Sequence, residues 1–355
     1  NLLGFDNGVF DLEKMEFRHG QPDDYVTIST NYSLPIHKSQ MPIALYKMEE
    51  KILMPQRNKQ KYNEMNEFIK QVLPNRRDNT GNWTDDRVRK YVMRFLSSCL
   101  SGEVCEEKFY FWTGSGGNGK SKIIELLDHS LGDYSKTLDV SFLTTKRGSS
   151  SNASPEVETI KHARFISCSE PEEDDKIYVG KLKQITGGDK LTTRGLYKET
   201  TEFKPQFKII LMCNEKPKLA GHDGGTWRRI EVVNFISEFT KNPRPTENDP
   251  HKFHADLKLS KKFDDWKIVF MLSLLKTYTE YKNIGTRAPE EVINGTSEYK
   301  IESDIISSWF NQLEECGLNE EGLAPTHIGE AYGWFTAFCD DAGVEKRNVP
   351  LKKKV

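Results

Sequence analysis

The spacing of hydrophobic residues changes several times along the chain, and each change predicts a different kind of structure. Residues 1–40 combine an Asp-Asn-Gly turn at positions 6–8 with a β-branched run at 25–30, which predicts a small β-rich element. From 41 to 107, apolar residues recur every three or four positions, as on the buried face of helices. Residues 108–240 alternate short apolar runs with helical or loop stretches, which is typical of an α/β core.

Helical spacing returns after the α/β region. The polar stretch 240–250 contains three prolines and predicts a loop or hinge. Residues 241–295 predict a helical extension of the core, with the helical spacing itself running from 251 to 295. Residues 296–355 predict a C-terminal helical module. Its aromatic stripe fits either a plain helix core or a winged-helix module that binds DNA.

One run in the α/β region carries a recognisable chemistry. Residues 114–121 read G-S-G-G-N-G-K-S, which meets the pattern G-x-x-x-x-G-K-[ST] at every fixed position. The run stands between a predicted buried strand at 108–112 and a predicted helix that begins near Lys120. Glycines let backbone N–H groups turn toward a phosphate, and the helix N-terminus adds the positive end of its dipole. The alternative is a glycine turn that contains Lys-Ser by coincidence.

This loop predicts a site for ATP and Mg²⁺. We expect Lys120 to contact the β- and γ-phosphates and to act in catalysis, and the Ser121 hydroxyl to hold the metal ion. The predicted ATP-binding residues are Gly114, Ser115, Gly116, Gly117, Asn118, Gly119, Lys120, Ser121 and Lys122.

Carboxylates follow a second apolar strand. Residues 163–168 read as a buried strand, and Ser169-Glu170-Pro171-Glu172 comes directly after it. An acidic residue at this place is suited to hold Mg²⁺ or to polarise an attacking water. Glu170 lies nearest the strand end and is predicted to be catalytic and metal-binding, with Glu172 as the substitute. Acidic residues continue to position 175, however, and such clusters are often solvated loops.

A third strand ends on an amide. Residues 207–213 are apolar and are followed by Asn214, whose side chain could hydrogen-bond both the γ-phosphate and the water. Asn after a strand is often only a turn residue. Because two matching strands precede it, we predict that Asn214 is a catalytic residue that senses the nucleotide.

Two arginines precede a fourth strand. Arg228 and Arg229 stand before the apolar run 230–233. An arginine offered to the γ-phosphate of a neighbouring subunit would stabilise the charge of the transition state. Both are predicted as candidates for this role, and either one could instead be a structural ion-pair partner.

Basic residues concentrate between the second and third strands. Segment 181–208 holds seven basic and three acidic residues, a local net charge of +4 in a chain whose total is −2. A protein that follows a nucleic-acid backbone needs such a concentration. The predicted DNA-binding residues are Lys190, Arg194 and Lys198.

Taken together, these motifs resemble those of superfamily 3 helicases, in particular the poxvirus-type primase-helicases of large DNA viruses and their phage relatives. The opening residues 4–12 and, loosely, residues 296–355 are also similar to segments of that family. The segments that carry the resemblance read G-S-G-G-N-G-K-S, S-E-P-E, K-Q-I-T-G-G-D-K-L-T-T-R-G-L-Y-K-E, F-K-I-I-L-M-C-N-E-K-P and G-G-T-W-R-R-I.

The resemblance implies a fold, an assembly and an activity. It implies an AAA+ type P-loop ATPase core, a helical collar at 41–107 and a ring-shaped homo-hexamer around single-stranded or forked DNA. It implies ATP-dependent unwinding by a replicative DNA helicase, with a pore hairpin near residues 190–198. It also implies an upstream primase domain of the same polypeptide. One departure is Pro171, which separates two acids that many members of the superfamily place side by side.

Composition limits the class of protein but does not choose the function. The chain has 355 residues, of which 36% are hydrophobic and 29% charged, as in a folded protein with a charged surface. The six cysteines include no C-x-x-C pair, and those at 168 and 213 lie in apolar runs, which suits buried thiols in a reducing compartment. No apolar run is long enough for a membrane span and no signal peptide is visible. We therefore expect an intracellular location. The resemblance implies a viral replication site, and we expect the chain to be a piece of a longer polypeptide.

Two other functional classes stay open. A P-loop kinase would also need the glycine loop, but it would add an acceptor pocket and an arginine-bearing lid, neither of which is visible in the sequence. A loader or scaffold ATPase that binds DNA without unwinding it could carry identical motifs.

Overall fold

The computed structural model divides into two compact units, residues 1–293 and residues 294–355. Each unit is treated by itself below. The structure describes residues 1–76, 85–145, 155–172, 175–194, 200–220, 224–247, 249–315, 327–341, 349 and 351.

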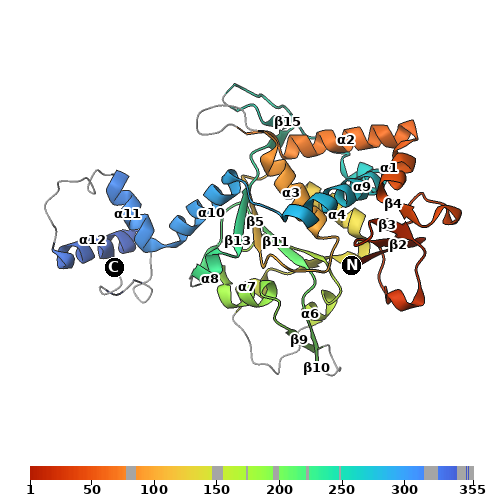
Figure 1. Ribbon diagram of the computed structural model, residues 1–355. Helices are drawn as coiled ribbons and strands as arrows, with labels where there is room; N and C mark the ends of the chain where they lie inside the picture. Colours follow the sequence, from red (N-terminus) through yellow and green to blue (C-terminus); the bar gives the residue numbers. More distant parts are fainter. Residues whose placement is uncertain are drawn as a thin grey trace. The chain divides into compact units, whose positions relative to one another are not determined.

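A sheet of five parallel strands forms the centre of the larger unit (Figure 1). Every residue of the two strands at 109–113 and 165–168 is buried, because a parallel sheet is covered on both faces. The predicted α/β class is therefore confirmed. The order across the sheet is β13 (Ile230–Asn234), β5 (Phe109–Thr113), β11 (Lys208–Met212), β7 (Phe165–Cys168) and β6 (Ser135–Leu138). Strand β6 was not predicted, since this edge strand is mostly polar.

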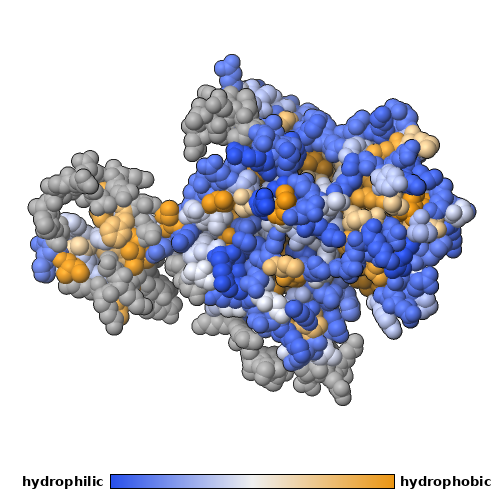
Figure 2. Space-filling view, viewed as in Figure 1, coloured by the Kyte–Doolittle hydropathy of each residue, from blue (hydrophilic) through white to orange (hydrophobic). Residues whose placement is uncertain are grey.

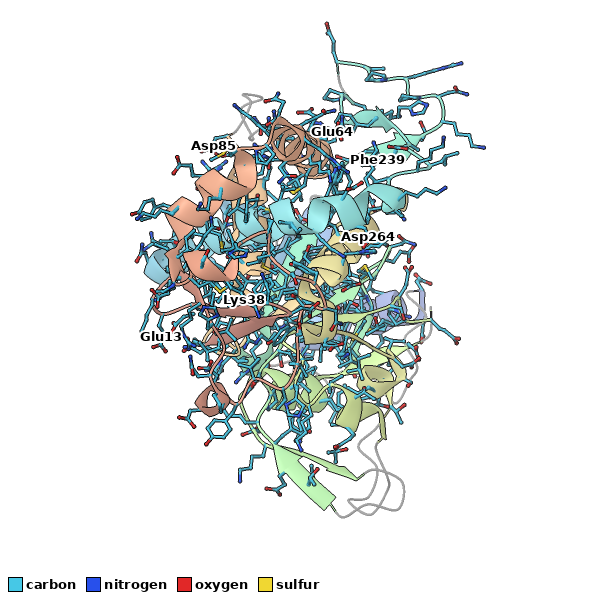
Figure 3. All side chains as sticks on the ribbon, turned by 90° about the vertical axis from the view of Figure 1, so that its right-hand side faces the viewer. Glu13, Lys38, Glu64, Asp85, Phe239 and Asp264 are labelled. Carbon is cyan, nitrogen blue, oxygen red and sulfur yellow. The ribbon has the colours of Figure 1, made fainter. Side chains whose placement is uncertain are left out.

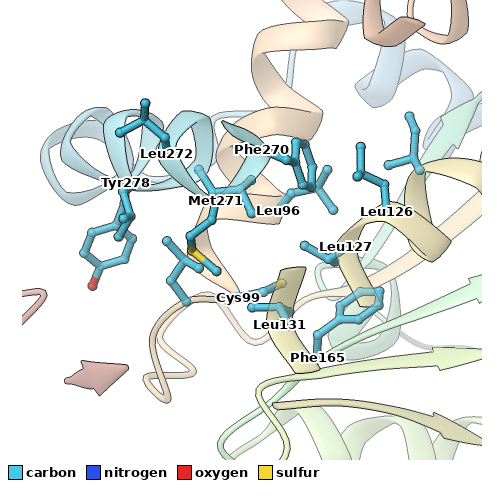
Figure 4. Close-up of a cluster of buried hydrophobic side chains, with 14 of the residues drawn as sticks. Leu96, Cys99, Leu126, Leu127, Leu131, Phe165, Phe270, Met271, Leu272 and Tyr278 are labelled. Carbon is cyan, nitrogen blue, oxygen red and sulfur yellow. The ribbon is translucent and has the colours of Figure 1, made fainter. Parts of the chain in front are cut away.

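Helices from three parts of the sequence pack against one another over this sheet. The long helix α9 contacts each of the other four, and Figure 4 shows part of the resulting core. There Leu96, Leu127 and Phe270 come from three different helices and belong, with Phe165 of β7, to one cluster of buried side chains. Full burial of each such side chain stabilises the fold by about 1.5–3 kcal/mol. The helices are α1 (Leu45–Leu53), α2 (Gln56–Val72), α3 (Arg87–Ser98), α4 (Lys120–Leu131) and α9 (Ser260–Ile284).

The N-terminal residues form a four-stranded antiparallel sheet. The prediction of β structure from the run at 25–30 is wrong, because this segment forms no strand. Thr30 instead donates one backbone hydrogen bond to the Gly4 carbonyl (3.0 Å), and the Tyr134 hydroxyl donates to the Ile28 carbonyl (3.0 Å). β-branched residues therefore fit a half-buried surface here without joining a ladder. The strands are β1 (Leu2–Phe5), β2 (Gly8–Asp11), β3 (Glu16–Arg18) and β4 (Ile43–Ala44).

Three further two-stranded sheets extend from the core. They pair β8 (Lys176–Tyr178) with β12 (Lys218–Ala220), β9 (Leu191–Arg194) with β10 (Thr200–Phe203), and β14 (Glu238–Thr240) with β15 (Lys252–His254). The helical prediction from residue 251 was thus wrong for β15, whose place is fixed by pairing with the distant β14. The shorter elements are η1 (Pro22–Asp24), η2 (Lys38–Gln40), η3 (Gly132–Tyr134), α5 (Ser141–Thr144), α6 (Pro155–Thr159), α7 (Val179–Thr186) and α8 (Gly224–Trp227).

Two buried cations fasten the end of α3 to the sheet. Lys208, the first residue of β11, donates from Nζ to the carbonyls of Ser98 and Ser101, both at 2.8 Å. Arg164 donates to the carbonyls of Leu100 and Leu2. Burial lowers the pKa of Lys208 to about 8. Carbonyls at a helix C-terminus lack partners within the helix, so these two side chains supply donors to carbonyls at the end of α3; the Ser98 carbonyl also accepts from the Ser101 N–H at 3.1 Å.

The C-terminal unit has a small core of its own. Trp309 and Phe335 lie with ring centroids 5.3 Å apart and pack with Cys339. The elements described in this unit are helical, and α10 begins just before the boundary. They are α10 (Glu290–Ser303), α11 (Ile305–Glu315) and α12 (Ile328–Asp341).

The outer surface is mainly polar. Figure 2 shows hydrophilic residues over most of this face of the larger unit, with apolar side chains in small groups. Among the helices that the structure describes, none is long and apolar enough to cross a membrane.

The burial of the cysteines predicts their reactivity. Cys99, Cys168 and Cys213 are buried, and desolvation raises the pKa of each thiol to about 12, whereas Cys105 is exposed. Because the thiolate is the reacting form, we expect iodoacetamide at pH 8 to modify Cys105 and to spare the other three until denaturant is added. Peptide mass mapping measures this. Modification of Cys168 in the native protein at the rate of Cys105 would contradict the buried position of β7.

Candidate nucleotide-binding site

The glycine-rich loop lies between the end of β5 and the start of α4, as predicted. Gly114, Gly116, Gly117 and Gly119 all have positive φ angles (154°, 90°, 60° and 82°), which residues with a Cβ rarely adopt. Space is also restricted. A Cβ on Gly119 would lie 2.7 Å from Cγ2 of Val72, and one on Gly114 would lie 2.3 Å from the Asn118 side-chain nitrogen. Glycine is therefore required at 114 and 119 by backbone conformation and by close contact.

Lys120 lies inside the loop. Its side chain is 6% exposed, and Nζ donates to the Gly114 carbonyl at 2.9 Å. Burial lowers the pKa of Lys120, while the nearby Cys213 and Glu170 groups act in the opposite direction. The ammonium group thus lies across the loop, with no ion-pair partner within 4 Å in the described part of the chain.

The loop offers donors that fit a triphosphate. Asn118 is buried, and among the residues that the structure describes its side-chain nitrogen has no hydrogen-bond partner. A buried donor without a partner calls for an explanation, and phosphate oxygens would supply one. Together with Lys120 and the N-terminus of α4, this donor makes the residues present compatible with ATP.

The two predicted residues after Lys120 differ in their surroundings. Ser121 is exposed in the first turn of α4. Lys122 is engaged away from the loop, because its Nζ donates to Glu125 and to Ser260, both at 2.7 Å. Its backbone N–H donates to the Gly119 carbonyl at 3.1 Å. Of the two, only Ser121 is therefore free to contact a ligand of the loop.

The structure brings Glu170 and Asn214 together. They follow β7 and β11, which are neighbouring parallel strands. The Asn214 backbone N–H donates to one carboxylate oxygen of Glu170 at 2.5 Å, and its side-chain amide donates to the other at 3.0 Å. The Asn214 side-chain oxygen lies 4.0 Å from the position of a Cβ on Gly116. Glu170, Asn214 and the loop therefore form one site, with Lys120 inside it.

The substitute acid Glu172 occupies a different environment. It is exposed, and its turn is closed by hydrogen bonds between Glu172 and Asp175: Glu172 N–H to the Asp175 carboxylate at 3.1 Å and Asp175 N–H to the Glu172 carbonyl at 3.0 Å. Residues 173–174 of the acidic cluster lie outside the described residues. Geometry thus favours Glu170 over Glu172 as the acid of the site.

Both arginines lie where the strands of the sheet begin, at the end opposite to the glycine-rich loop. The Phe109 N–H donates to the Arg229 carbonyl at 2.7 Å, which places Arg229 beside the first residue of β5, whereas the loop follows the last. Five residues of strand at about 3.3 Å each separate the two ends by roughly 17 Å. Arg228 and Arg229 are therefore not brought to the loop of their own chain.

The two arginines have different surroundings. Arg229 is 9% exposed and donates to Glu107 and to the Gly225 carbonyl, both at 2.8 Å. The Arg228 side chain is 66% exposed and lies 3.8 Å from the same carboxylate. Arg229 is thus buried and paired with a partly exposed carboxylate, and Arg228 is the one available to another molecule.

The predicted DNA-binding residues belong to the β9–β10 hairpin. Lys190 directly precedes β9, is exposed, and lies 3.6 Å from Glu202. Arg194 is the last residue of β9 and pairs with Thr200 of β10. Lys198 lies outside the described residues. The two that can be placed are at the base and near the tip of one projecting hairpin.

Sequence reasoning missed the segment that supports the loop from one side. The Phe239 N–H donates to the Gly117 carbonyl at 2.8 Å, and a Cβ on Gly114 would lie 2.7 Å from the Phe235 carbonyl. Figure 3 shows Phe239 where the β14–β15 segment leaves the body of the protein. These contacts span more than one hundred residues, and no local pattern announces them.

One family of proteins matches the centre of the chain. It is described as a family of unknown function (DUF5906), and it matches residues 112–229, which include the loop, Glu170, Asn214 and both arginines.

Relatives of the chain occur in large DNA viruses. "Putative helicase L207/L206" of Acanthamoeba polyphaga mimivirus is 41% identical over 314 residues, which cover 87% of this chain and 30% of that protein. "Putative helicase 022R" of Frog virus 3 (isolate Goorha) is 29% identical over 267 residues, which cover 72% of this chain and 26% of that protein. "Putative primase C962R" of African swine fever virus (isolate Warthog/Namibia/Wart80/1980) is 25% identical over 54% of this chain and 21% of that protein. The chain thus spans less than a third of the length of these relatives.

Among solved structures, the apo C-terminal region of NrS-1 is similar over 77% of this chain and 61% of that chain, with a TM-score of 0.45 and 11% identity.

The glycine geometry yields a stability prediction. We expect Gly119→Ala to lower the free energy of unfolding by about 1–3 kcal/mol, because the φ of 82° and the Val72 contact both oppose a Cβ. Gly180→Ala in α7 is the control, since a Cβ there meets no atom within 4 Å and alanine favours the helix. Urea unfolding measures both. Equal midpoints for the two variants would contradict the loop conformation.

Proposed function

We propose that this chain is the ATPase and helicase part of a viral replication protein, of superfamily 3 type with an AAA+ core. It would couple ATP hydrolysis to movement along single-stranded DNA and to unwinding of a duplex. The single observation that carries the proposal is the gathering of Lys120, Glu170 and Asn214 around a glycine-rich loop at one edge of a parallel sheet. The strand order of that sheet and the helicase and primase names of its relatives support it.

The residues of the site divide the work of hydrolysis. Backbone N–H groups of the loop, the Asn118 amide and Lys120 bind and orient the phosphates. Ser121 and Glu170 provide the oxygen atoms that a bound Mg²⁺ prefers. Glu170 also orients the attacking water, and Asn214 holds the Glu170 carboxylate in place through two hydrogen bonds. Bound MgATP supplies the phosphoryl group whose transfer to water drives the cycle.

The separation of Arg228 from its own loop leads to the proposed assembly. Since Arg228 lies exposed at the opposite edge of the sheet, it would complete the site of a neighbouring copy. A head-to-tail contact of this kind closes into a ring when the rotation between copies allows it. We propose a homo-hexamer, as the resemblance implies, with the β9–β10 hairpins directed at the DNA and an upstream primase domain in the full polypeptide.

Mixing two inactive variants tests a site shared between copies. Lys120→Ala and Arg228→Ala should each lower ATP hydrolysis and strand displacement on a forked duplex by about a thousandfold or more. In mixed rings, a subunit that keeps Lys120 can receive Arg228 from its neighbour, so activity should return to about a quarter of the wild-type level. Lys120→Ala mixed with Ser121→Ala is the control and should stay inactive, because both residues belong to one loop. Failure of the first mixture to recover would exclude Arg228 as the shared residue.

The hairpin yields a prediction for DNA binding. Lys190→Ala combined with Arg194→Ala should weaken binding of single-stranded DNA and lower the salt dependence, by about 0.7 in log–log slope for each lost phosphate contact. Fluorescence anisotropy at several salt concentrations measures it. Lys59→Ala, at an exposed position on α2, is the control for the change in charge. Unchanged affinity of the double variant would contradict a role of the hairpin in DNA binding.

A further inference from the structure

Two lysines outside the hairpin lie directly opposite each other on neighbouring strands. In the parallel pair of β8 and β12, Lys176 is the register partner of Lys218, and Ile177 is the partner of Leu219. Both lysines are exposed, whereas Ile177 is fully buried, so the lysines share the outer face of this small sheet. In the residues that the structure describes, neither lysine forms an ion pair or a hydrogen bond.

This arrangement has an electrostatic cost. Neighbouring strands lie about 4.8 Å apart, and like charges placed opposite each other across strands destabilise a sheet. Among the nearby acidic residues that the structure describes, none forms an ion pair with either lysine. Glu170 accepts both hydrogen bonds of Asn214, and Glu172 and Asp175 close their own turn. Two like charges thus stand opposite each other with no compensating contact among the described residues. Such a departure from ordinary strand pairing is expected at a functional site, and a ligand of opposite charge would relieve the repulsion.

The lysine pair lies on the same side of the sheet as the candidate nucleotide site. β8 continues the chain beyond Glu170, and β12 continues it beyond Asn214, only four residues before Lys218. Four residues span at most about 14 Å. From β8 the chain runs through α7 into the β9–β10 hairpin, and Figure 1 shows α7 and the hairpin in the lower part of the view. Lys176 thus lies in the sequence between Glu170 and the hairpin, and its partner Lys218 follows Asn214 after the hairpin.

We propose that Lys176 and Lys218 bind phosphates of single-stranded DNA, as a second contact in addition to the hairpin. This inference rests on the proposed function and adds residues that its motifs do not include. Two adjacent ammonium groups suit the repeated charges of a nucleic-acid backbone, and they read no sequence. Tyr178, two residues along β8, lies on the same face and is half-buried, so it offers a ring on which a base can stack. Basic residues beside an aromatic ring are typical of sites for single strands.

The test measures binding of an oligo-dT strand at several salt concentrations. Lys176→Gln and Lys218→Gln should each lower the log–log salt slope by about 0.7, and the double variant by about 1.4. An oligo-dA strand should show the same loss, because phosphates carry the contact. An oligo-rU strand tests whether RNA, which offers the same phosphates, binds equally. Lys59→Gln on α2 is the matched control, and its slope should equal that of the wild type.

A charge reversal separates binding from folding. Lys218→Glu places a carboxylate opposite Lys176, so the thermal midpoint should stay the same or rise while DNA binding falls further than with Lys218→Gln. A fall in the midpoint together with unchanged DNA binding would overturn the proposal. Two other results would also overturn it. In one, the double glutamine variant has the same salt slope of DNA binding as Lys59→Gln; in the other, the double variant loses only self-assembly.

The outcomes also separate this inference from the proposed function. If the wild type binds DNA and the hairpin variant weakens it, but the Lys176 and Lys218 variants do not, only the inference fails. If the wild type binds no single-stranded DNA at all, both fail.

Discussion

The parallel pairing of β5, β7 and β11 is the constraint on which the rest of the structure depends. Parallel strands share one polarity, so whatever follows them in the sequence gathers at the same edge of the sheet. At that edge lie the glycine loop, Glu170 and Asn214, although they are about fifty residues apart along the chain. The hydrogen bonds between Asn214 and Glu170 are a direct result of this register. Without it, each motif would be an isolated polar turn.

The same polarity gives the other edge a different chemistry. Arg164, Lys208 and Arg229 stand at or next to the first residues of their strands, and all three are buried cations that meet carbonyl or carboxylate oxygens. Glu107 contributes there in an unusual conformation, with a φ of 52° that costs a residue with a side chain some stability. Its carboxylate lies 2.8 Å from a guanidinium nitrogen of Arg229 and 3.8 Å from one of Arg228, so Glu107 contacts both arginines.

The sequence predicted those parts of the structure that depend on residues close together in the chain. The strands of the sheet other than β6, the loop and the main helices follow from apolar spacing and from glycine, because these signals need only neighbouring residues. The errors arose where distant contacts decide. Residues 25–30 pack on Tyr134 without a ladder, and residues 252–254 become a strand only because β14 lies beside them. Burial, which no motif reveals, was needed to distinguish Arg228 from Arg229, and the hydrogen bonds of Lys122 to Glu125 and Ser260 were needed to place it away from the loop. The domain boundaries predicted from the sequence, the winged-helix alternative for residues 296–355 and the roles of the site residues stay predictions.

The contact between Val72 and Gly119 has a consequence for protein engineering. Val72 is the last residue of α2, and its side chain lies against the glycine with which the phosphate loop ends, where an added Cβ would have no room. The helices before the sheet and the loop are therefore not independent modules. A chimera that kept this sheet but took its first helices from another protein would need a side chain no larger than valine at that position. The helix that replaces α2 would also have to end at the same position relative to the loop. Otherwise the glycine loop of the protein that supplied the helices would have to be transferred together with them.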